Sequence, residues 1–230
     1  DSFGRTIVDV YTYTIDSTVG TVPTLSISGT SVNVSGEVWV SPTTAIALSN
    51  LNDDINGIGI SHTECRNGSS SWTQINSAAL NLNAVSGQEV LFSIECRLVD
   101  RLGNKGSSVW SNGTVDARSP TLSINPNSGT TIALNSSISI QLSDTAGVGT
   151  SLLRWTWVNG THTTWSNLTI SGNSWNGSVS TAMGALTDGS VSLDVYGFDT
   201  LGNIQTISKS WTLNTTIVPT TLVISGNVIG

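Results

Sequence analysis

The sequence has few of the side chains that carry most catalysis and metal chemistry. Its 230 residues include two histidines, two cysteines and one methionine. Few groups can therefore titrate near neutral pH or bind a soft metal ion. Serine is abundant, but no Gly-x-Ser-x-Gly elbow or other nucleophile context surrounds any of these serines. We therefore expect a protein that is not an enzyme and needs no organic cofactor.

Charge is also scarce, and long apolar runs are missing. Only 10% of the residues are charged, with 15 acidic and 8 basic side chains and a net charge of -7. Without a basic excess, nucleic acid is not an expected partner. Apolar runs extend over a few residues, whereas a membrane-spanning helix needs about 20. Neither a charged segment nor an apolar one follows Asp1, so we expect a processed protein or an excerpt from a longer one.

What the sequence does contain is an internal repeat. The pattern Asp-x-(Phe/Leu)-Gly-(Arg/Asn) begins at residues 1, 100 and 199, and so recurs every 99 residues. Each copy precedes an alternating stretch with an aromatic residue, then a proline and a strand-like run. This phase predicts the end of one unit, two whole units and the start of a further unit, over residues 1–20, 21–118, 119–217 and 218–230 respectively.

The incomplete units at the two ends predict how the chain is connected. Residues 1–15 are expected to form the last strand of one sandwich, and residues 219–230 the first strand of another. A lone strand can neither pair its backbone nor bury its apolar face. We therefore expect further repeats on either side, or insertion of these strands into adjacent subunits. In both cases the expected partner is another copy of the same kind of unit.

Within each unit the hydrophobic period is two. Apolar residues alternate with polar ones over 191–196 and again over 92–99, which is typical of half-buried strands. No stretch sustains the 3.6-residue period of a helix. Turn residues divide each unit into about seven short strands, as an immunoglobulin-like sandwich requires. The predicted fold is all-β, with tandem immunoglobulin-like β-sandwiches.

The junction between the units resembles a known family. Asp100-Arg-Leu-Gly-Asn104, followed by an alternating strand and then Thr114-Val-Asp-Ala-Arg-Ser-Pro-Thr-Leu122, is similar to the end-and-start signature of bacterial Ig-like domains. Such domains are strung in tandem in large adhesins and surface-layer proteins of bacteria and archaea. The third copy departs from the signature, with Asn214 near the position of the linker acid.

The resemblance implies a cell-surface or otherwise extracellular protein. It favours a structural role, in which the modules build a stalk, a surface layer or a filament. The alternative is an adhesin whose modules bind a glycan or a cell-surface protein. An exposed aromatic patch would mark the adhesin.

The two cysteines are expected to pair. Alignment of the repeats places Cys65 opposite Trp157 and Cys96 opposite Val195, all in the inward-facing register. The third and sixth strands, which carry Cys65 and Cys96, are neighbours in an Ig-like sheet, so a disulfide can form there in an oxidising compartment. Two unpaired buried thiols remain the alternative.

Acidic residues are expected to gather at one pole of each sandwich. In an Ig-like topology the incoming linker and the loops after the second and sixth strands meet there. Carboxylates at such a junction could bind Ca²⁺, the one ion this composition suggests. Alternatively, each Asp caps its own turn, and no contiguous calcium loop is present. The residues are Asp16, Asp53, Asp54 and Asp100 in the first unit, and Asp116, Asp144 and Asp199 in the second.

Sequons and tryptophans complete the set of candidate sites. Trp155 and Trp157 share one face of a strand and are expected in the core, whereas Trp165 or Trp175 could offer a platform for a sugar. His62 and His162 lack partners at a metal-binding spacing, so we expect them to be solvated or structural. Glycosylation sequons, which a suitable source would modify, lie at Asn33, Asn67, Asn112, Asn135, Asn159, Asn167, Asn176 and Asn214.

Overall fold

The structure is a computed structural model of the 230-residue chain. It describes residues 4, 6, 8–13, 15–54, 56–159, 162–179 and 186–216, without the side chains of 159, 162 and 164. The expected strand at residues 218–230 lies outside the described residues, and so do most of residues 1–5. Regular structure in the described part is built from strands β1 to β17. No helix in this part is long and apolar enough to cross a membrane.

The first whole repeat forms two facing sheets. The smaller sheet has the order β1-β4-β7 and the larger one the order β2-β3-β9-β8-β5-β6. The pairs β1–β4, β4–β7, β2–β3, β5–β6 and β5–β8 are antiparallel, with Leu25 opposite Leu48 in β1–β4 and Cys65 opposite Cys96 in β5–β8. The strands are β1 (Thr24–Ser28), β2 (Ser31–Val34), β3 (Glu37–Val40), β4 (Ala45–Ser49), β5 (Ile60–Asn67), β6 (Thr73–Ile75), β7 (Ala79–Asn81), β8 (Glu89–Asp100) and β9 (Val109–Asp116).

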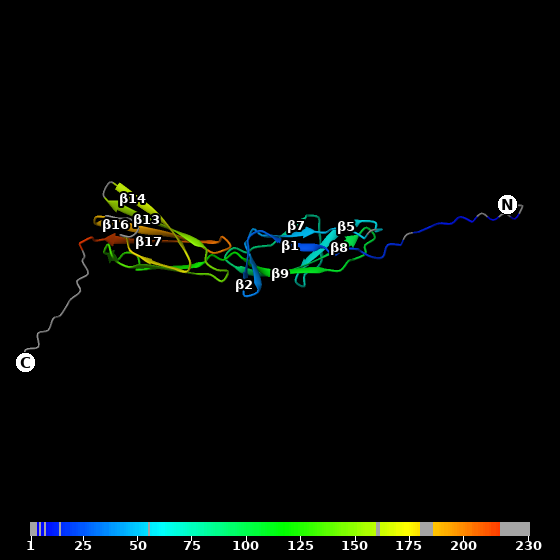
Figure 1. Cartoon of the computed structure of the whole chain (residues 1–230), viewed down its shortest axis with the longest axis horizontal. Coiled ribbons are helices and arrows are strands. Elements are labelled where there is room, and N and C mark those ends of the chain that lie inside the picture. Colours follow the sequence, from blue (N-terminus) through cyan, green and yellow to red (C-terminus); the bar gives the residue numbers. More distant parts are fainter. Residues whose placement is uncertain are drawn as a thin grey trace, which may run out of the picture. The chain divides into compact units, whose positions relative to one another are not determined.

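The second repeat has the same two-sheet plan. One sheet has the order β10-β12-β15 and the other β11-β17-β16-β13-β14. The long strands β13, β16 and β17 lie side by side in Figure 1, and only β11 runs parallel to its neighbour, β17. The strands are β10 (Thr121–Asn125), β11 (Thr131–Ile132), β12 (Ile138–Ser143), β13 (Thr150–Asn159), β14 (His162–Ser171), β15 (Ser174–Gly177), β16 (Gly189–Phe198) and β17 (Ile204–Leu213).

Both repeats have the strand order of an immunoglobulin-like sandwich. In the first repeat β1, β4 and β7 form one sheet, and β5, β8 and β9 lie in the other. In the second repeat β10, β12 and β15 form one sheet, and β13, β16 and β17 lie in the other, which is the immunoglobulin-like division of strands. The alternating sequence produces this arrangement, because every second side chain of a strand points into the space between the sheets. The chain is therefore all-β with tandem immunoglobulin-like sandwiches, as the sequence predicts.

Backbone proximity divides the chain into two compact units. The first unit comprises Asp1–Gly29, Thr43–Asn83 and Leu91–Val115. The second comprises Thr30–Pro42, Ala84–Val90 and Asp116–Gly230. The terms "first unit" and "second unit" refer to these sets below. The boundaries predicted from the repeat, at 21–118 and 119–217, remain a prediction.

The core of the second unit is built around Trp155. This side chain is fully buried, and its ring lies 6.4 Å from that of Trp175 and 6.1 Å from that of Trp211, measured between centroids. Trp157 is also buried, and its indole N–H donates to the carbonyl of Thr187 at 3.1 Å. The expectation that Trp155 and Trp157 fill the core is confirmed.

The predicted disulfide is confirmed, but one step in its derivation is wrong. Cys65 and Cys96 are buried and bonded to each other. In the second repeat, however, Val195 lies opposite Leu153, so Leu153 rather than Trp157 is the counterpart of Cys65. The alignment error is four residues, an even number, and therefore leaves the side chain on the same face of the strand.

The alternating segment near the N-terminus is not paired. Residues 8–13 and 15–20 belong to no strand. The apolar side chains up to Ile15 face solvent, with Val10 84% and Ile15 87% exposed, whereas Val19 is partly buried. In the described part of the chain, this segment therefore finds no sheet of its own to join.

Candidate functional site

The repeated Asp-x-Leu-Gly-Asn motif forms a closed turn after the sixth strand of each sandwich. In the first copy, Asp100 Oδ1 accepts hydrogen bonds from the backbone N–H groups of Leu102 and Asn104, both at 2.8 Å. Gly103 occupies the left-handed region with φ 88°, where a side chain is disfavoured. Asn104 Nδ2 donates to Asp100 Oδ2 at 2.7 Å. Each position that the repeats share in this motif therefore has a local role in the turn.

The second copy repeats this geometry. Asp199 Oδ1 accepts from the N–H groups of Leu201 at 2.9 Å and Asn203 at 2.8 Å, and Gly202 has φ 95°. Asn203 Nδ2 donates to Asp199 Oδ2 at 2.6 Å. The expectation that an Asp caps its own turn is thus confirmed for Asp100 and Asp199.

The motif's asparagine also holds the incoming linker. Asn104 Nδ2 donates to the backbone carbonyl of Asp16, and Asn203 Nδ2 donates to that of Asp116, both at 3.0 Å. These two linker residues lie 88 and 87 positions before their asparagines. In each unit, the asparagine at the end of the motif therefore holds the linker that enters that unit.

In the second unit this arrangement brings three carboxylates together. Asp116, Asp144 and Asp199 each place one oxygen within 4.8 Å of the others. Asp116 is fully buried and Asp199 is 3% exposed, while Asp144 is partly buried. They come from the end of β9, the loop after β12 and the turn after β16, as expected for one pole of the sandwich.

Close backbone contacts set the distance between these loops. The Thr200 hydroxyl donates to the carbonyl of Ala146, and the Thr200 N–H donates to that of Gly147 at 2.9 Å. A Cβ at Gly149 would lie 2.6 Å from the carbonyl oxygen of Asp199, so only glycine fits there. The loops that carry Asp144 and Asp199 are therefore locked against each other.

Burial and repulsion from neighbouring acids disfavour the charged forms of Asp144 and Asp116. Burial raises the pKa of Asp144 to about 6, and the charges of Asp116, Asp199 and Glu89 add to the rise, against one hydrogen bond from the Ala146 N–H. Burial is also the largest cause of the raised pKa of Asp116. Burial and the neighbouring acids thus both oppose ionisation of these two carboxyl groups.

One buried oxygen of the cluster has no hydrogen-bond partner. Asp116 Oδ1 accepts a hydrogen bond from the Arg118 N–H at 2.9 Å, but Oδ2 is sealed from solvent without a hydrogen bond. The guanidinium of Arg118 pairs instead with Glu89, at 3.1 Å. Within the residues that the structure describes, no lysine, arginine or histidine forms an ion pair with Asp116, Asp144 or Asp199.

The acids of the first unit are arranged differently. Asp16, Asp53 and Asp54 approach one another as closely, but all three are partly exposed and accept hydrogen bonds. Asp53 Oδ2 accepts from the Gly59 N–H at 2.7 Å, and Asp54 Oδ2 accepts from the Thr18 hydroxyl at 2.8 Å. Asp16 uses both of its oxygens, for the N–H groups of Thr18 and Ile58. Asp100, expected in this set, is not part of it.

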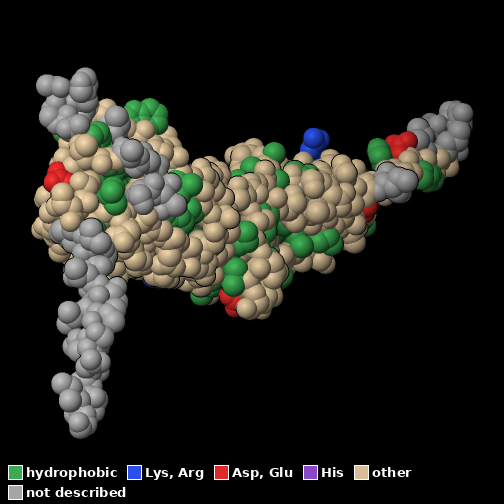
Figure 2. All heavy atoms as spheres, turned by 60° about the vertical axis from the view of Figure 1, so that its left-hand side comes forward, with side chains coloured by type: hydrophobic (Ala, Val, Ile, Leu, Met, Phe, Trp, Pro, Cys, Tyr) green, Lys and Arg blue, Asp and Glu red, His purple; other side chains and the backbone are tan. Residues whose placement is uncertain are grey.

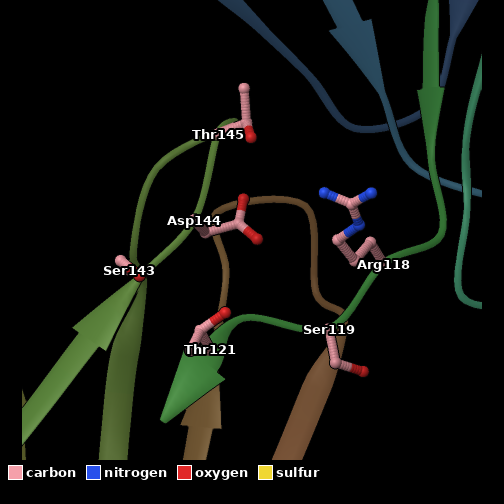
Figure 3. A pocket seen from close by; sticks show the side chains of 6 residues that line it. All are labelled: Arg118, Ser119, Thr121, Ser143, Asp144 and Thr145. Atoms are coloured by element: carbon pink, nitrogen blue, oxygen red, sulfur yellow. The ribbon is translucent and has the colours of Figure 1, made fainter.

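A shallow pocket of about 260 Å³ opens beside Asp144. Figure 3 shows the Asp144 carboxylate on one side of this hollow and the Arg118 guanidinium on the other. Hydroxyl groups complete its wall, and the lining residues are Arg118, Ser119, Thr121, Ser143, Asp144 and Thr145. The partly buried member of the cluster is therefore reachable from solvent.

The sequence did not reveal a charged ladder on the outer face of the first unit. Arg97 binds Glu64 at 2.7 Å and Arg66 binds Glu95 across β5 and β8. Both guanidinium groups cover the ring of Trp72, at 3.9 Å for Arg97 and 4.6 Å for Arg66. These partners are adjacent only because of the register between the strands, which the sequence alone did not fix.

The remaining candidates are distributed over the surface. Six sequon asparagines are exposed and Asn214 is partly buried, whereas the side chain of Asn159 lies outside the description. Trp165 is 59% exposed beneath Arg154, and Trp175 packs against the core. Figure 2 shows hydrophobic side chains scattered among uncharged polar ones on the visible face. The exposed sequon residues are Asn33, Asn67, Asn112, Asn135, Asn167 and Asn176.

Comparison with known proteins yields distant structural neighbours. No family model matches the chain, and no curated protein matches it significantly. The FN1–FN3 domains of chicken CNTN1 share 9% identity over 86% of this chain and 69% of that one, with a TM-score of 0.37. The Clostridium thermocellum CbhA fibronectin(III)-like modules share 12% identity over 84% of this chain and 94% of that one, with a TM-score of 0.36. A structure from a 1.5-MDa bacterial ice-binding adhesin shares 19% identity over 86% of this chain and 66% of that one, with a TM-score of 0.35.

Proposed function

We propose that the chain is a non-catalytic structural segment of a protein of the cell exterior. Its immunoglobulin-like modules act as spacers in a stalk, a surface layer or a filament. The observation that carries this proposal is the repeated anchor, in which Asn104 and Asn203 hold the carbonyls of Asp16 and Asp116 at the same distance of 3.0 Å. A spacer needs each module to fix the next length of chain in the same way.

The difference between the repeats supports the same proposal. The cysteine pair occurs only in the first repeat. The first repeat also has no tryptophan at the position equivalent to the buried Trp155 of the second. The turn and the linker contact are retained in spite of these differences. What both units preserve is thus the connection between modules rather than a surface that could bind one ligand.

The disulfide favours an extracellular location. Disulfides persist in oxidising compartments and are rare where glutathione keeps thiols reduced. Exposed sequons on both repeats are compatible with glycosylation in that location. Intact-mass measurement of the native protein, before and after enzymatic removal of N-linked glycans, tests for the modification.

Assembly through the N-terminal segment is part of the proposal. Val8, Val10, Tyr11, Tyr13 and Ile15 are more than two-thirds exposed in a segment that pairs with no strand. A further repeat or an adjacent subunit could accept this segment as a strand and bury those side chains. The partner is then another immunoglobulin-like unit of the same kind.

Electron microscopy of the native material tests the structural role. We expect ordered filaments, lattices or stalks built from the repeat. Isolated fibres that end in a distinct binding domain would instead support an adhesin. Strand exchange has its own test, because removal of residues 1–15 should abolish assembly and leave both units folded. If the truncated protein assembles as well as the whole chain, strand exchange through this segment is excluded.

The adhesin is kept as a second candidate because Trp165 is exposed. An exposed indole ring can stack on a sugar, and here it lies on β14 with Arg154 5.6 Å from its centroid. Binding of the chain to a glycan array, lost in Trp165→Ala and kept in Trp110→Ala, would favour this candidate. Trp110 is a suitable control because it is 50% exposed in the other unit.

A further inference from the structure

We propose that Asp116, Asp144 and Asp199 of the second unit form a binding site for a Ca²⁺ ion. The inference goes beyond the structural role, because a spacer does not require an ion. It also narrows the seven aspartates expected at the two acidic poles to three. Only oxygen ligands are available here, and oxygen ligands suit a hard cation rather than zinc.

The separation of the carboxylates fits one ion. Their nearest oxygens all lie within 4.8 Å of one another. Ca²⁺ takes its oxygen ligands at about 2.3–2.6 Å, so two ligands on opposite sides of the ion are about 4.6–5.2 Å apart. A single ion can therefore contact an oxygen of all three residues without movement of the backbone.

The buried oxygen of Asp116 is the observation that points to a ligand. Asp116 is fully buried, and its Oδ2 has no hydrogen-bond donor. A carboxylate oxygen in such a place is costly unless a proton or a cation compensates it. Asp144 and Asp199 lie next to it and carry the same sign of charge, so a shared cation would satisfy all three groups together.

The site is held in position by contacts outside the ion's coordination shell. Turn hydrogen bonds from the N–H groups of Ala146 and Leu201 fix Asp144 and Asp199. Ala146 and Leu201 in turn pack with Trp39 in a small buried cluster of the same unit. The carboxylates are therefore preorganised, which reduces the conformational cost of binding an ion.

Further ligands and an entry path are also at hand. The pocket beside Asp144 opens to solvent and can admit a hydrated ion and its waters (Figure 3). Glu89 lies near enough to interact with Asp116 and Asp144, and already pairs with Arg118. Arg118 forms its ion pair with Glu89, and its charge also partly lowers the pKa of Asp116. Waters fill the rest of the six to eight positions that Ca²⁺ requires.

The first unit supplies a matched comparison. Asp16, Asp53 and Asp54 have a similar separation, but they are partly exposed and accept hydrogen bonds from nearby N–H and hydroxyl groups. Nothing in that set leaves a buried oxygen unsatisfied. We therefore place the ion in the second unit, with a stoichiometry of one per chain.

Calorimetric titration of the chelator-treated 230-residue chain with CaCl₂ tests the site. We expect one binding event per chain and an increase in melting temperature with added Ca²⁺. MgCl₂ at the same concentration should produce a smaller increase, because Mg²⁺ demands tighter octahedral geometry. Tb³⁺ should luminesce on excitation of tryptophan, since Trp39 packs against the two residues that hold Asp144 and Asp199.

Two variants separate the sites. Asp144→Asn should weaken Ca²⁺ binding at least about tenfold, a factor that corresponds to 1.4 kcal/mol. Asp54→Asn, in the first unit, should bind Ca²⁺ as the original chain does. The Asp144→Asn variant is expected to fold, because it removes a negative charge that its neighbours disfavour.

The proposal is overturned if the original chain shows neither a binding heat nor a change in melting temperature in millimolar Ca²⁺. It is also overturned if Asp54→Asn abolishes binding while Asp144→Asn retains it. None of these outcomes depends on the proposed structural role, which electron microscopy tests separately.

Discussion

Asn203 Nδ2 donates a hydrogen bond to the backbone carbonyl of Asp116, which lies 87 residues earlier in the chain, at 3.0 Å. The same nitrogen donates to Asp199 Oδ2 at 2.6 Å. One side chain thus joins the linker, the turn after β16 and the acidic cluster. Asn104 makes the corresponding contacts with Asp16 and Asp100.

Replacement of this asparagine should destabilise the unit that contains it. Asn203→Ala removes a donor to a carboxylate and a donor to a carbonyl, so we expect the free energy of unfolding to fall by about 1–3 kcal/mol. Asn104→Ala should act in the same direction. Urea denaturation measures both changes. Exposed Asn135 is a suitable control, and Asn135→Ala should change the value by no more than about 0.5 kcal/mol. An equal effect of Asn203→Ala and Asn135→Ala would contradict the anchor.

The cysteine bridge should contribute measurably to stability. Cys65 and Cys96 are separated by 31 residues. A bridge across a loop of that size reduces the entropy of the unfolded chain and contributes about 3–4 kcal/mol. Peptide mapping without reductant should yield one linked pair of peptides. The double variant Cys65→Ala/Cys96→Ala should unfold at a lower denaturant concentration than the original chain. Recovery of two free thiols from the folded native protein would refute the bridge.

The acidic cluster should make the metal-free second unit more stable in weak acid. Burial raises the pKa of Asp144 from 3.8 to about 6. Between these values the folded protein binds more protons than the unfolded chain, so stability falls as pH rises from about 4 through about 6. Asp116, Asp199 and Glu89 oppose the charged form, and Arg118 lies at the same pole.

Thermal unfolding across this pH range, with chelator present, measures the effect. Asp144→Asn removes the titration of Asp144, so the melting temperature of this variant should change less with pH between pH 4 and 6. If the melting temperature of this variant changes with pH as much as that of the original chain, another group is responsible for the pH dependence.

Trp72 should be coupled energetically to the arginines above it. Arg97 lies 3.9 Å from the ring centroid, and its partner Glu64 keeps it in place. A double-mutant cycle of Trp72→Ala and Arg97→Ala should yield a coupling energy of about 0.5–1 kcal/mol. Urea denaturation of the four proteins provides the energies. A coupling of zero would mean that the stacked geometry contributes nothing to folding.

Local features of the molecule could be predicted from the sequence. The hydrophobic period of two fixes which side chains face the core, so Trp155, Trp157 and both cysteines were placed inward correctly. The Asp-x-Leu-Gly-Asn turn was also identifiable, since its hydrogen bonds join residues two and four positions apart. The four-residue error that matched Cys65 with Trp157 left both facing the core, because an even offset preserves the face of a strand.

Distances between loops were decided only by the tertiary structure. The sequence grouped Asp100 with the acids of its unit, yet Asp100 lies outside the cluster of that unit, whereas its counterpart Asp199 lies beside Asp116 and Asp144. The two turns have the same local geometry. What differs is how closely the neighbouring loops approach and how deeply the linker acid is buried, and both depend on packing between segments far apart in the chain. For that reason the sequence predicted which residues could form an acidic pole, and packing alone decided which of them leaves a buried oxygen without a partner.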